Sequence, residues 1–285
     1  MKTKIALAQI DSVLGDVEKN VSHHLKFIKE AISKKAKLIV FPELSLSGYS
    51  IKDLVGEVAI NLNDSKILNP IKKASEKISI LLGSVEESDE FGLYNSAFYF
   101  ENGNVKSIHR KIYLPTYGMF EEGRHFSAGK NLHVQQNKNL GKIGVLICED
   151  AWHINLPYLL AHQGAKTIFS LTASPMRIGT NHNLENLDKI NQEHQKTFSR
   201  LLSLYSIYIN RVGVEDGVQF SGGSQVINPF GEVVAKASFM NEELIFAEID
   251  DNVIRKGRRN SRHFLDDSLN LTQRLISQII KNSGG

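Results

Sequence analysis

Apolar, strand-like segments alternate with amphipathic, helix-like segments along most of the chain. Short runs rich in β-branched and aromatic residues predict strands at residues 4–9, 38–41, 78–85, 96–101, 104–112, 143–147, 167–171, 206–212, 223–228 and 244–249. Apolar residues at helical spacing predict helices at residues 17–34, 66–76, 156–162, 184–203 and 267–280. Strands that alternate with helices in this way are typical of an α/β fold.

Two turn motifs indicate that some neighbouring strands run antiparallel. An Asn-Gly pair at residues 102–103 and a Pro-Phe-Gly turn at residues 229–231 each separate two strand-like runs, which is the signature of a hairpin. The sheets are therefore predicted to be mixed. Because no Pro- or Ser-rich linker and no repeat interrupts the pattern, we expect one domain over residues 1–285, with a more mobile tail from about residue 251.

The composition is that of an ordinary globular protein, since 41% of the 285 residues are apolar and 23% are charged. It excludes a disordered or fibrous chain. A formal net charge of +3 and a single dense basic run, at residues 255–259, give no reason to expect nucleic-acid binding. The longest apolar stretch, residues 201–209, is far shorter than the roughly 20 residues that span a bilayer, so no membrane segment is expected.

The cysteine content and the start of the chain predict a cellular location. One cysteine excludes an internal disulfide. After the charged first residues, Gln9 and Asp11 interrupt the first apolar run, which rules out the apolar core of a signal peptide. Both features predict a cytoplasmic protein.

The single cysteine, Cys148, directly follows the strand predicted at residues 143–147. A residue in this place lies at the carboxyl edge of a sheet, where open α/β proteins place their sites. Cys148 is therefore a candidate nucleophile, and the alternative is a small buried apolar residue. Because Glu149 and Asp150 follow at once and would raise the pKa of the thiol, a catalytic role requires a nearby cation.

Two further candidates stand near the ends of predicted strands. Glu43 follows the apolar run at residues 38–41, and a buried glutamate in this position can act as a general base. Its alternative role is that of a solvated turn residue. Lys111 lies within the strand predicted at residues 104–112, and in isolation it is one of many lysines.

Taken together, Glu43, Lys111 and Cys148 resemble the Glu-Lys-Cys triad of the nitrilase superfamily of carbon-nitrogen hydrolases. The three residues occur in the order of that family, and their spacings of 68 residues (43 to 111) and 37 residues (111 to 148) are similar to those of the family. Glu122 matches the further glutamate that the superfamily places after the lysine. Glu121 is its adjacent rival for that position.

Local motifs further resemble the glutaminase domain of glutamine-dependent NAD synthetases. These motifs are Leu-Ser-Gly-Tyr at residues 46–49, Leu-Pro-Thr-Tyr at 114–117, Cys-Glu-Asp-Ala-Trp at 148–152 and Ala-Ser-Pro at 173–175. Two differences stand out. The synthetases continue into an ATP-using domain that a chain of this length cannot contain, and Thr180 stands where a basic residue commonly binds the glutamine carboxylate. Arg177 is the candidate replacement, and its alternative is a solvated side chain.

The resemblance implies an αββα sandwich of two mixed sheets that pairs with a second copy to form four layers. It implies hydrolysis of a small-molecule amide C–N bond through a thioester on Cys148, with ammonia released and a glutamine-like amide as the leading substrate. Glu43 would be the base and Lys111 the oxyanion donor, and no metal or cofactor is required. The alternatives are a nitrilase or an N-carbamoyl-amine amidase with the same triad, or a catalytically silent interaction protein of this fold.

The remaining predictions concern the substrate pocket and the partners. The candidate substrate-binding or supporting residues are Glu122, Tyr117, Glu149, Trp152, Ser174 and Arg177. Tyr117 and Trp152 are either pocket walls or ordinary core aromatics. The spacing of the histidines gives no metal site. The expected partners are a second copy of the chain, in a homodimer or a larger homo-oligomer that involves residues 255–264, and a separate ammonia-using synthetase.

Overall fold

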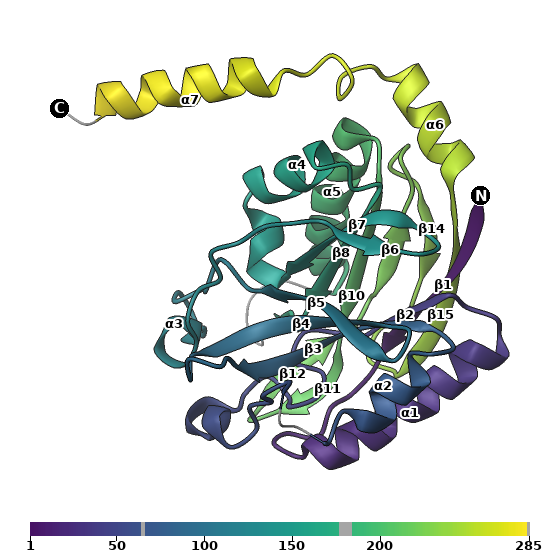
Figure 1. Ribbon diagram of the computed structural model, residues 1–285, viewed down its shortest axis with the longest axis vertical. Helices are drawn as coiled ribbons and strands as arrows, with labels where there is room; N and C mark the ends of the chain where they lie inside the picture. The colour runs from purple at the N-terminus through teal and green to yellow at the C-terminus, as the bar shows by residue number, and fades with distance from the viewer. Residues whose placement is uncertain (64–65, 177–183, 284–285) are drawn as a thin grey trace.

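Two six-stranded sheets face each other in the computed structural model, which describes residues 1–63, 66–176 and 184–283 (Figure 1). The first sheet has the order β15-β1-β2-β3-β4-β5, with bounds Glu243–Asp250, Lys2–Gln9, Leu38–Val40, Ser79–Glu87, Leu93–Glu101 and Asn104–Arg110. The second has the order β14-β13-β10-β8-β7-β6, with bounds Val233–Lys236, Gln225–Ile227, Tyr205–Asn210, Thr167–Thr172, Gly141–Ile147 and Gln135–Asn137. Each sheet has three parallel strands with antiparallel strands beside them, so both sheets are mixed.

Helices cover the outer face of each sheet. The helices α1 (Val17–Ser33) and α2 (Asn69–Ala74) pack on the first sheet, and α4 (Asn155–His162) and α5 (Leu184–Leu202) pack on the second (Figure 1). A small third sheet joins β9 (Pro175–Met176), β11 (Val212–Glu215) and β12 (Val218–Ser221). The α/β sandwich of two mixed sheets predicted from the sequence is confirmed.

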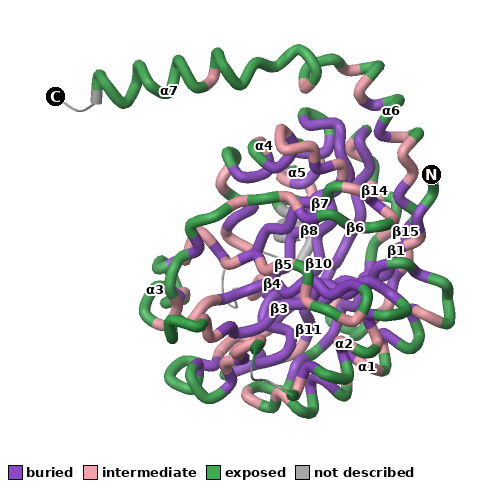
Figure 2. Tube along the Cα trace, viewed as in Figure 1, coloured by how far each residue is buried: buried purple, intermediate pink, exposed green. Residues whose placement is uncertain are grey.

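The strands are buried on both faces, which explains their nearly continuous apolar runs. In β1, Ile5 and Leu7 face the core between the two sheets, whereas Ala6 and Ala8 face the helices. Figure 2 shows this buried interior beneath an exposed rim of loops and helices. Because alternate side chains of one strand enter different cores, each sheet is held between two apolar layers.

Both predicted hairpins are present. The β4–β5 turn has positive φ at Asn102 (52°) and Gly103 (77°), as a tight two-residue turn requires. The second hairpin joins β13 to β14, with Gly231 at a φ of 78°.

The structure corrects several predicted boundaries. The strand predicted at residues 206–212 is wrong in its last part, because β10 ends at Asn210 and β11 starts at Val212 in another sheet. The strand predicted at residues 104–112 ends at Arg110. The short strands β6, β9, β12 and β14 escaped prediction, since two to four residues carry almost no periodic signal.

The segment expected to be a tail from about residue 251 contains two helices. The side chain of Asp250 accepts a hydrogen bond from the Asn252 N–H (2.9 Å) and caps α6 (Asp251–Asn260). Ile254 of α6 is buried in the core between the sheets. The helix α7 (Leu269–Ser283) then projects from the body of the molecule (Figure 1). None of the described helices is both long and apolar enough to cross a membrane.

A glycine of β3 holds the turn that carries Glu43. A Cβ added to Gly83 would lie 2.4 Å from the Leu44 nitrogen and 2.6 Å from the Pro42 oxygen, and both are backbone atoms that cannot move aside. The Gly83 N–H also donates to the Pro42 carbonyl (3.2 Å). The turn after β2 therefore requires a glycine at this position of the neighbouring strand.

We predict that Gly83→Ala lowers the free energy of unfolding by about 1–3 kcal/mol or more, because the added methyl group displaces the backbone of the turn. The matched control is Gly56→Ala, since a Cβ on Gly56 meets no atom within 4 Å. The control should stay within about 1 kcal/mol of the wild type in urea unfolding. Equal stabilities of the two variants would contradict the close packing at Gly83.

Candidate active site

A fully buried ammonium group lies between two carboxylates. Lys111 follows the end of β5, and its Nζ donates to Glu43 Oε1 (2.8 Å) and to Glu122 Oε1 (2.7 Å). The side chain is 0% exposed. Burial opposes the charge on Lys111, but the attraction of Glu122 and Glu43 outweighs it and raises the pKa of the amine well above its ordinary value. Lys111 therefore stays protonated.

Glu43 connects the two sheets. Its Oε1 accepts a second hydrogen bond, from Asn95 Nδ2 of β4 (2.8 Å), and its Oε2 accepts one from the Ala173 N–H that follows β8 (2.8 Å). With Lys111, three donors fix a carboxylate that is 1% exposed. Asn95 and Ala173 were missed by sequence reasoning. The only sequence signal for Asn95 was a polar amide side chain within the apolar run of β4. Ala173 contributes a backbone N–H, and a backbone group leaves no signal in the sequence.

Glu122 is the first residue of the short helix α3 (Glu122–His125). Its Oε1 also accepts a hydrogen bond from the Tyr49 hydroxyl (2.7 Å), while its Oε2 is buried without a hydrogen-bond partner among the described residues. Burial raises the pKa of Glu122 to about 7, against the opposing attraction of Lys111. Glu121, its rival in the sequence, is exposed. The structure therefore places Glu122, and not Glu121, at Lys111.

Cys148 stands directly after β7, at the start of the short 3-10 helix η2 (Cys148–Trp152). Its φ of 46° is unusual for a residue other than glycine, and such strained backbone is common at functional sites. The thiol is partly buried. Burial and the charge of Glu43 raise the pKa of the thiol well above its ordinary value, although Lys111 opposes this. The sulfur thus carries its proton near neutral pH and needs a base to become a nucleophile.

Asp150 joins the segment after β5 to the end of β7. Its Oδ1 accepts the backbone N–H groups of Ile112 and Tyr113 (both 2.9 Å), and its Oδ2 accepts the Ile147 N–H (3.1 Å). Oδ2 also lies 2.9 Å from His109 Nε2. The buried carboxylate therefore fixes the position of Lys111 relative to Cys148. Sequence reasoning assigned Asp150 no such role, because an acid after a strand more often faces solvent.

A second group of polar and aromatic side chains lies outside the buried charges. The Tyr117 hydroxyl donates to Glu149 Oε2 (2.8 Å), and His153 Nε2 lies 3.8 Å from Glu149 Oε1. Tyr117 and Trp152 are half exposed, so neither is an ordinary core aromatic. The Ser174 N–H donates to Asn210 Oδ1 (2.9 Å).

Two positions considered in the sequence analysis, Arg177 and Thr180, lie outside the described residues. Within the part of the chain that is described, no group of three or more His, Cys, Asp or Glu side chains is arranged to hold a metal ion.

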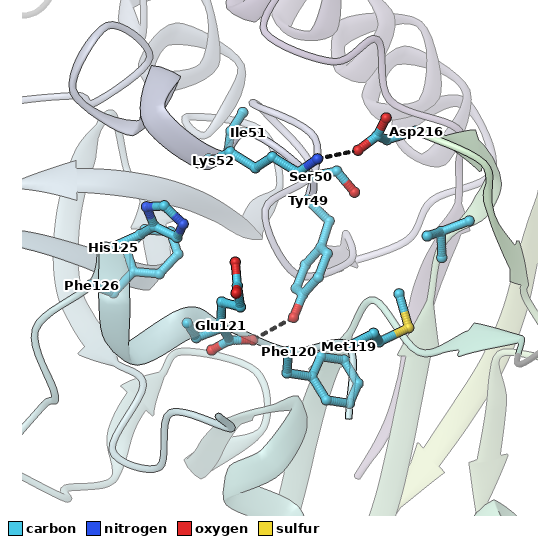
Figure 3. Close-up of a pocket in the computed structure, with 12 residues that line it drawn as sticks. Tyr49, Ser50, Ile51, Lys52, Met119, Phe120, Glu121, His125, Phe126 and Asp216 are labelled. Atoms are coloured by element: carbon cyan, nitrogen blue, oxygen red, sulfur yellow. Dashed lines mark hydrogen bonds and ion pairs between the residues drawn. The ribbon is translucent and has the colours of Figure 1, made fainter. Parts of the chain in front are cut away.

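A cavity of about 210 Å³ borders the buried charges on the Tyr49 and Glu122 side (Figure 3). Lys52 and Asp216 form an ion pair beside it, between the segment after Tyr49 and the β11–β12 turn. Phe120 and Phe126 contribute apolar walls. The cavity has both polar and apolar walls and room for a small molecule.

Known proteins resemble this chain in sequence. The chain matches the carbon-nitrogen hydrolase family over residues 4–259. It is 34% identical over 274 residues to a glutamine-dependent NAD(+) synthetase of Acinetobacter baylyi, an alignment that covers 96% of this chain and 49% of the relative. The chain thus spans about half the length of the curated synthetases that it matches.

Two solved structures share the fold. The glutamine-dependent NAD+ synthetase of Acinetobacter baumannii, in complex with ADP, has a TM-score of 0.79 at 32% identity and covers 89% of this chain and 47% of its own. A member of branch 10 of the nitrilase superfamily from Saccharomyces cerevisiae has a TM-score of 0.79 at 26% sequence identity. The match covers 91% of this chain and 94% of the yeast chain. The match over most of the chain and the shared fold show that this protein belongs to the carbon-nitrogen hydrolase family, within the nitrilase superfamily, and is an enzyme that hydrolyses carbon–nitrogen bonds.

Proposed function

We propose that the enzyme hydrolyses the C–N bond of a small primary amide through a thioester on Cys148. The observation that carries this proposal is the buried Lys111 ammonium, which donates to the carboxylate of Glu43, while Asp150 joins the segment after Lys111 to the end of β7 next to Cys148. A base, a fixed positive charge and a thiol are the three groups that acyl transfer to sulfur requires.

In the first half of the proposed reaction, Glu43 accepts the thiol proton while Sγ of Cys148 attacks the amide carbon. The carbonyl oxygen becomes negatively charged, and Lys111 Nζ stabilises it, with the backbone N–H after Cys148 as a second donor. Glu43 then gives its proton to the departing nitrogen, the C–N bond breaks, and ammonia leaves. The acyl group remains on sulfur as a thioester.

In the second half, a water molecule takes the place of the amine. Glu43 accepts a proton from this water as its oxygen attacks the thioester carbon, and Lys111 again stabilises the oxyanion. The C–S bond breaks, the carboxylic acid leaves, and the proton returns from Glu43 to the sulfur. One base therefore serves both halves, in agreement with a carboxylate that three donors hold in place.

The side-chain amide of glutamine is the proposed substrate. Relatives at 30–34% identity are named glutamine-dependent NAD(+) synthetases. Glu149, directly after the proposed nucleophile, is a carboxylate that can bind the ammonium group of an amino acid, and Tyr117 fixes its orientation. We further propose that the ammonia is used by a separate synthetase. A nitrile or a carbamoyl amine would use the same three groups.

The test is ammonia release from glutamine, small aliphatic amides, nitriles and carbamoyl amines. We expect turnover of glutamine, and no turnover by Cys148→Ala, because alanine removes the nucleophile. Circular dichroism should show that this variant is folded. Efficient turnover of nitriles with none of the amides would overturn the substrate proposal, and turnover by Cys148→Ala would overturn the covalent mechanism.

We predict that Lys111→Met lowers kcat/KM about a hundredfold or more, because the oxyanion loses its main charged donor. Loss of the cation between Glu43 and Glu122 should also raise the pKa of Glu122 above about 7, so that this carboxyl is protonated at neutral pH. The matched control is Lys106→Met, which removes an exposed lysine from β5. Near-normal kcat/KM in Lys111→Met would contradict the assigned role of Lys111.

We also propose that the protein forms a homodimer or a larger homo-oligomer through its C-terminal segment. Figure 2 shows most of the α7 helix as exposed. Its apolar side chains Leu269, Leu271, Leu275 and Ile276 are 45–51% exposed. A 15-residue helix is marginally stable on its own in water, and an exposed apolar face of this kind marks an interface. A groove beside Phe264, lined by Ile154, Phe198 and Leu201, offers an apolar surface on the same chain.

Sedimentation should therefore show a species larger than 31.9 kDa at micromolar concentration. The double substitution Ile276→Lys with Ile280→Lys should dissociate it, because two charges enter the apolar face of α7. The control is Asn270→Lys with Ser277→Lys, which changes the polar face of the same helix. A wild type that sediments only as a monomer would refute the proposal.

A further inference from the structure

A buried ion pair on the small third sheet holds the loop that carries Tyr49. We propose that Arg211 and Glu215 are positioning residues for the active site: they fix the backbone at Tyr49 so that its hydroxyl donates to Glu122 and keeps this carboxylate directed at Lys111. The inference rests on the proposed function only where it predicts a change in turnover. The contacts that lead from Arg211 through Glu215 and Tyr49 to Glu122 do not depend on which substrate is bound.

The first link joins Glu215 to the backbone of the loop. Glu215 Oε2 accepts hydrogen bonds from the Tyr49 N–H (2.8 Å) and the Ser50 N–H (3.0 Å). The loop approaches this carboxylate closely at Gly48, where an added Cβ would lie 2.7 Å from Glu215 Oε1 and φ is +81°. Two backbone donors on one carboxylate oxygen fix the start of the Tyr49 side chain.

The second link holds the Glu215 side chain in place. Its Oε1 pairs with Arg211 Nη1, and both side chains are almost completely buried. Arg211 Nη2 also donates to Asp11 Oδ1 (3.0 Å), and the guanidinium lies over the Phe220 ring at 4.5 Å. An arginine held by two carboxylates and an aromatic ring has one orientation, so it serves as a rigid anchor.

The third link is the Tyr49 side chain itself. Its ring packs edge-on against Phe220, with 6.0 Å between the ring centroids. Its hydroxyl donates to Glu122 Oε1 (2.7 Å). Burial, followed by the charge of Glu122, raises the pKa of the Tyr49 phenol well above its ordinary value, so the phenol keeps its proton and acts as the donor. Figure 3 shows the hydroxyl of Tyr49 directed into this hydrogen bond.

The charged surroundings of Glu122 determine the sign of the effect. Burial and Glu43 raise the pKa of the Glu122 carboxyl, whereas Lys111 and the hydrogen bond from Tyr49 lower it. The charged and titratable groups that line the adjacent cavity are Lys52, Glu121, His125 and Asp216, and the thiol of Cys148 lies on the active-site side. Because Lys111 and Tyr49 are the two side chains that donate to Glu122 among the described residues, loss of the phenol must raise the pKa of the carboxyl.

The test is Tyr49→Phe, which removes only the hydroxyl. We expect the pKa of Glu122 to rise by about one unit, since a hydrogen bond to a charged group has an effect of that size. Carbon-13 NMR of the glutamate carboxyls, with the signal assigned through Glu122→Gln, measures this value without any substrate. The acid limb of the kcat/KM profile should move up by the same amount.

The matched control is Tyr99→Phe. It also removes a buried phenol that donates to a carboxylate, Glu101 Oε1 at 2.8 Å, but it lies outside the active site. It should leave both the Glu122 titration and the acid limb unchanged. An unchanged Glu122 titration in Tyr49→Phe would overturn the inference.

A double-mutant cycle tests whether Glu215 acts through Tyr49. Glu215→Gln should raise the pKa of Glu122 in the wild-type background and have no further effect in the Tyr49→Phe background. If Glu215→Gln does not fold, Glu215→Asp, which keeps the charge but shortens the side chain, replaces it. Additive shifts in the two substitutions would contradict the role of Glu215. A shifted titration without ammonia release from any amide would refute the proposed function and leave this inference standing.

Discussion

The structure depends on one buried ammonium group, Lys111, that lies between two carboxyl groups. Removing Lys111 would leave two acidic groups facing each other in the interior without a cation, which costs several kcal/mol. Lys111 donates to both Glu43 and Glu122, and each of these carboxyl groups accepts a further hydrogen bond from another side chain. Each buried polar group in this cluster needs hydrogen-bond partners. This need explains why residues from both sheets and from three loops meet around Lys111.

The two-sheet architecture supplies these partners at a place where strands end. Glu43 follows β2 of the first sheet, and Cys148 follows β7 of the second. Hydrogen bonds cross between the sheets at Ala173 and at Asp150, so Glu43 and Cys148 are fixed relative to each other by backbone as well as by side chains. In the proposed mechanism, the raised pKa keeps the Cys148 thiol protonated at rest, and Glu43 takes its proton as the sulfur attacks the substrate.

The sequence was sufficient to predict the fold class, the main strands and the juxtaposition of Glu43 and Lys111, because each follows from long periodic runs or from motifs with a distinctive order. It was not sufficient to predict the supporting contacts. The Asp150 carboxylate binds three backbone N–H groups from two segments, and the Arg211–Glu215 pair lies on strands of four residues or fewer or next to them. Such contacts form only when segments that are distant in the sequence come together in the fold, and this leaves no local sequence pattern. The basic segment that forms α6 was missed for a related reason, since few apolar residues mark its buried face.

In the proposed mechanism, Lys111 stabilises an oxyanion formed on an acyl group attached to Cys148. The most direct measurement is a crystal structure of the wild-type enzyme soaked with glutamine and frozen during turnover, so that the thioester is trapped before water hydrolyses it. We expect a γ-glutamyl group bonded to the sulfur of Cys148, with its carbonyl oxygen within hydrogen-bond distance of Lys111 Nζ. An acyl group on another residue, or a thioester whose carbonyl oxygen lies away from Lys111, would contradict it.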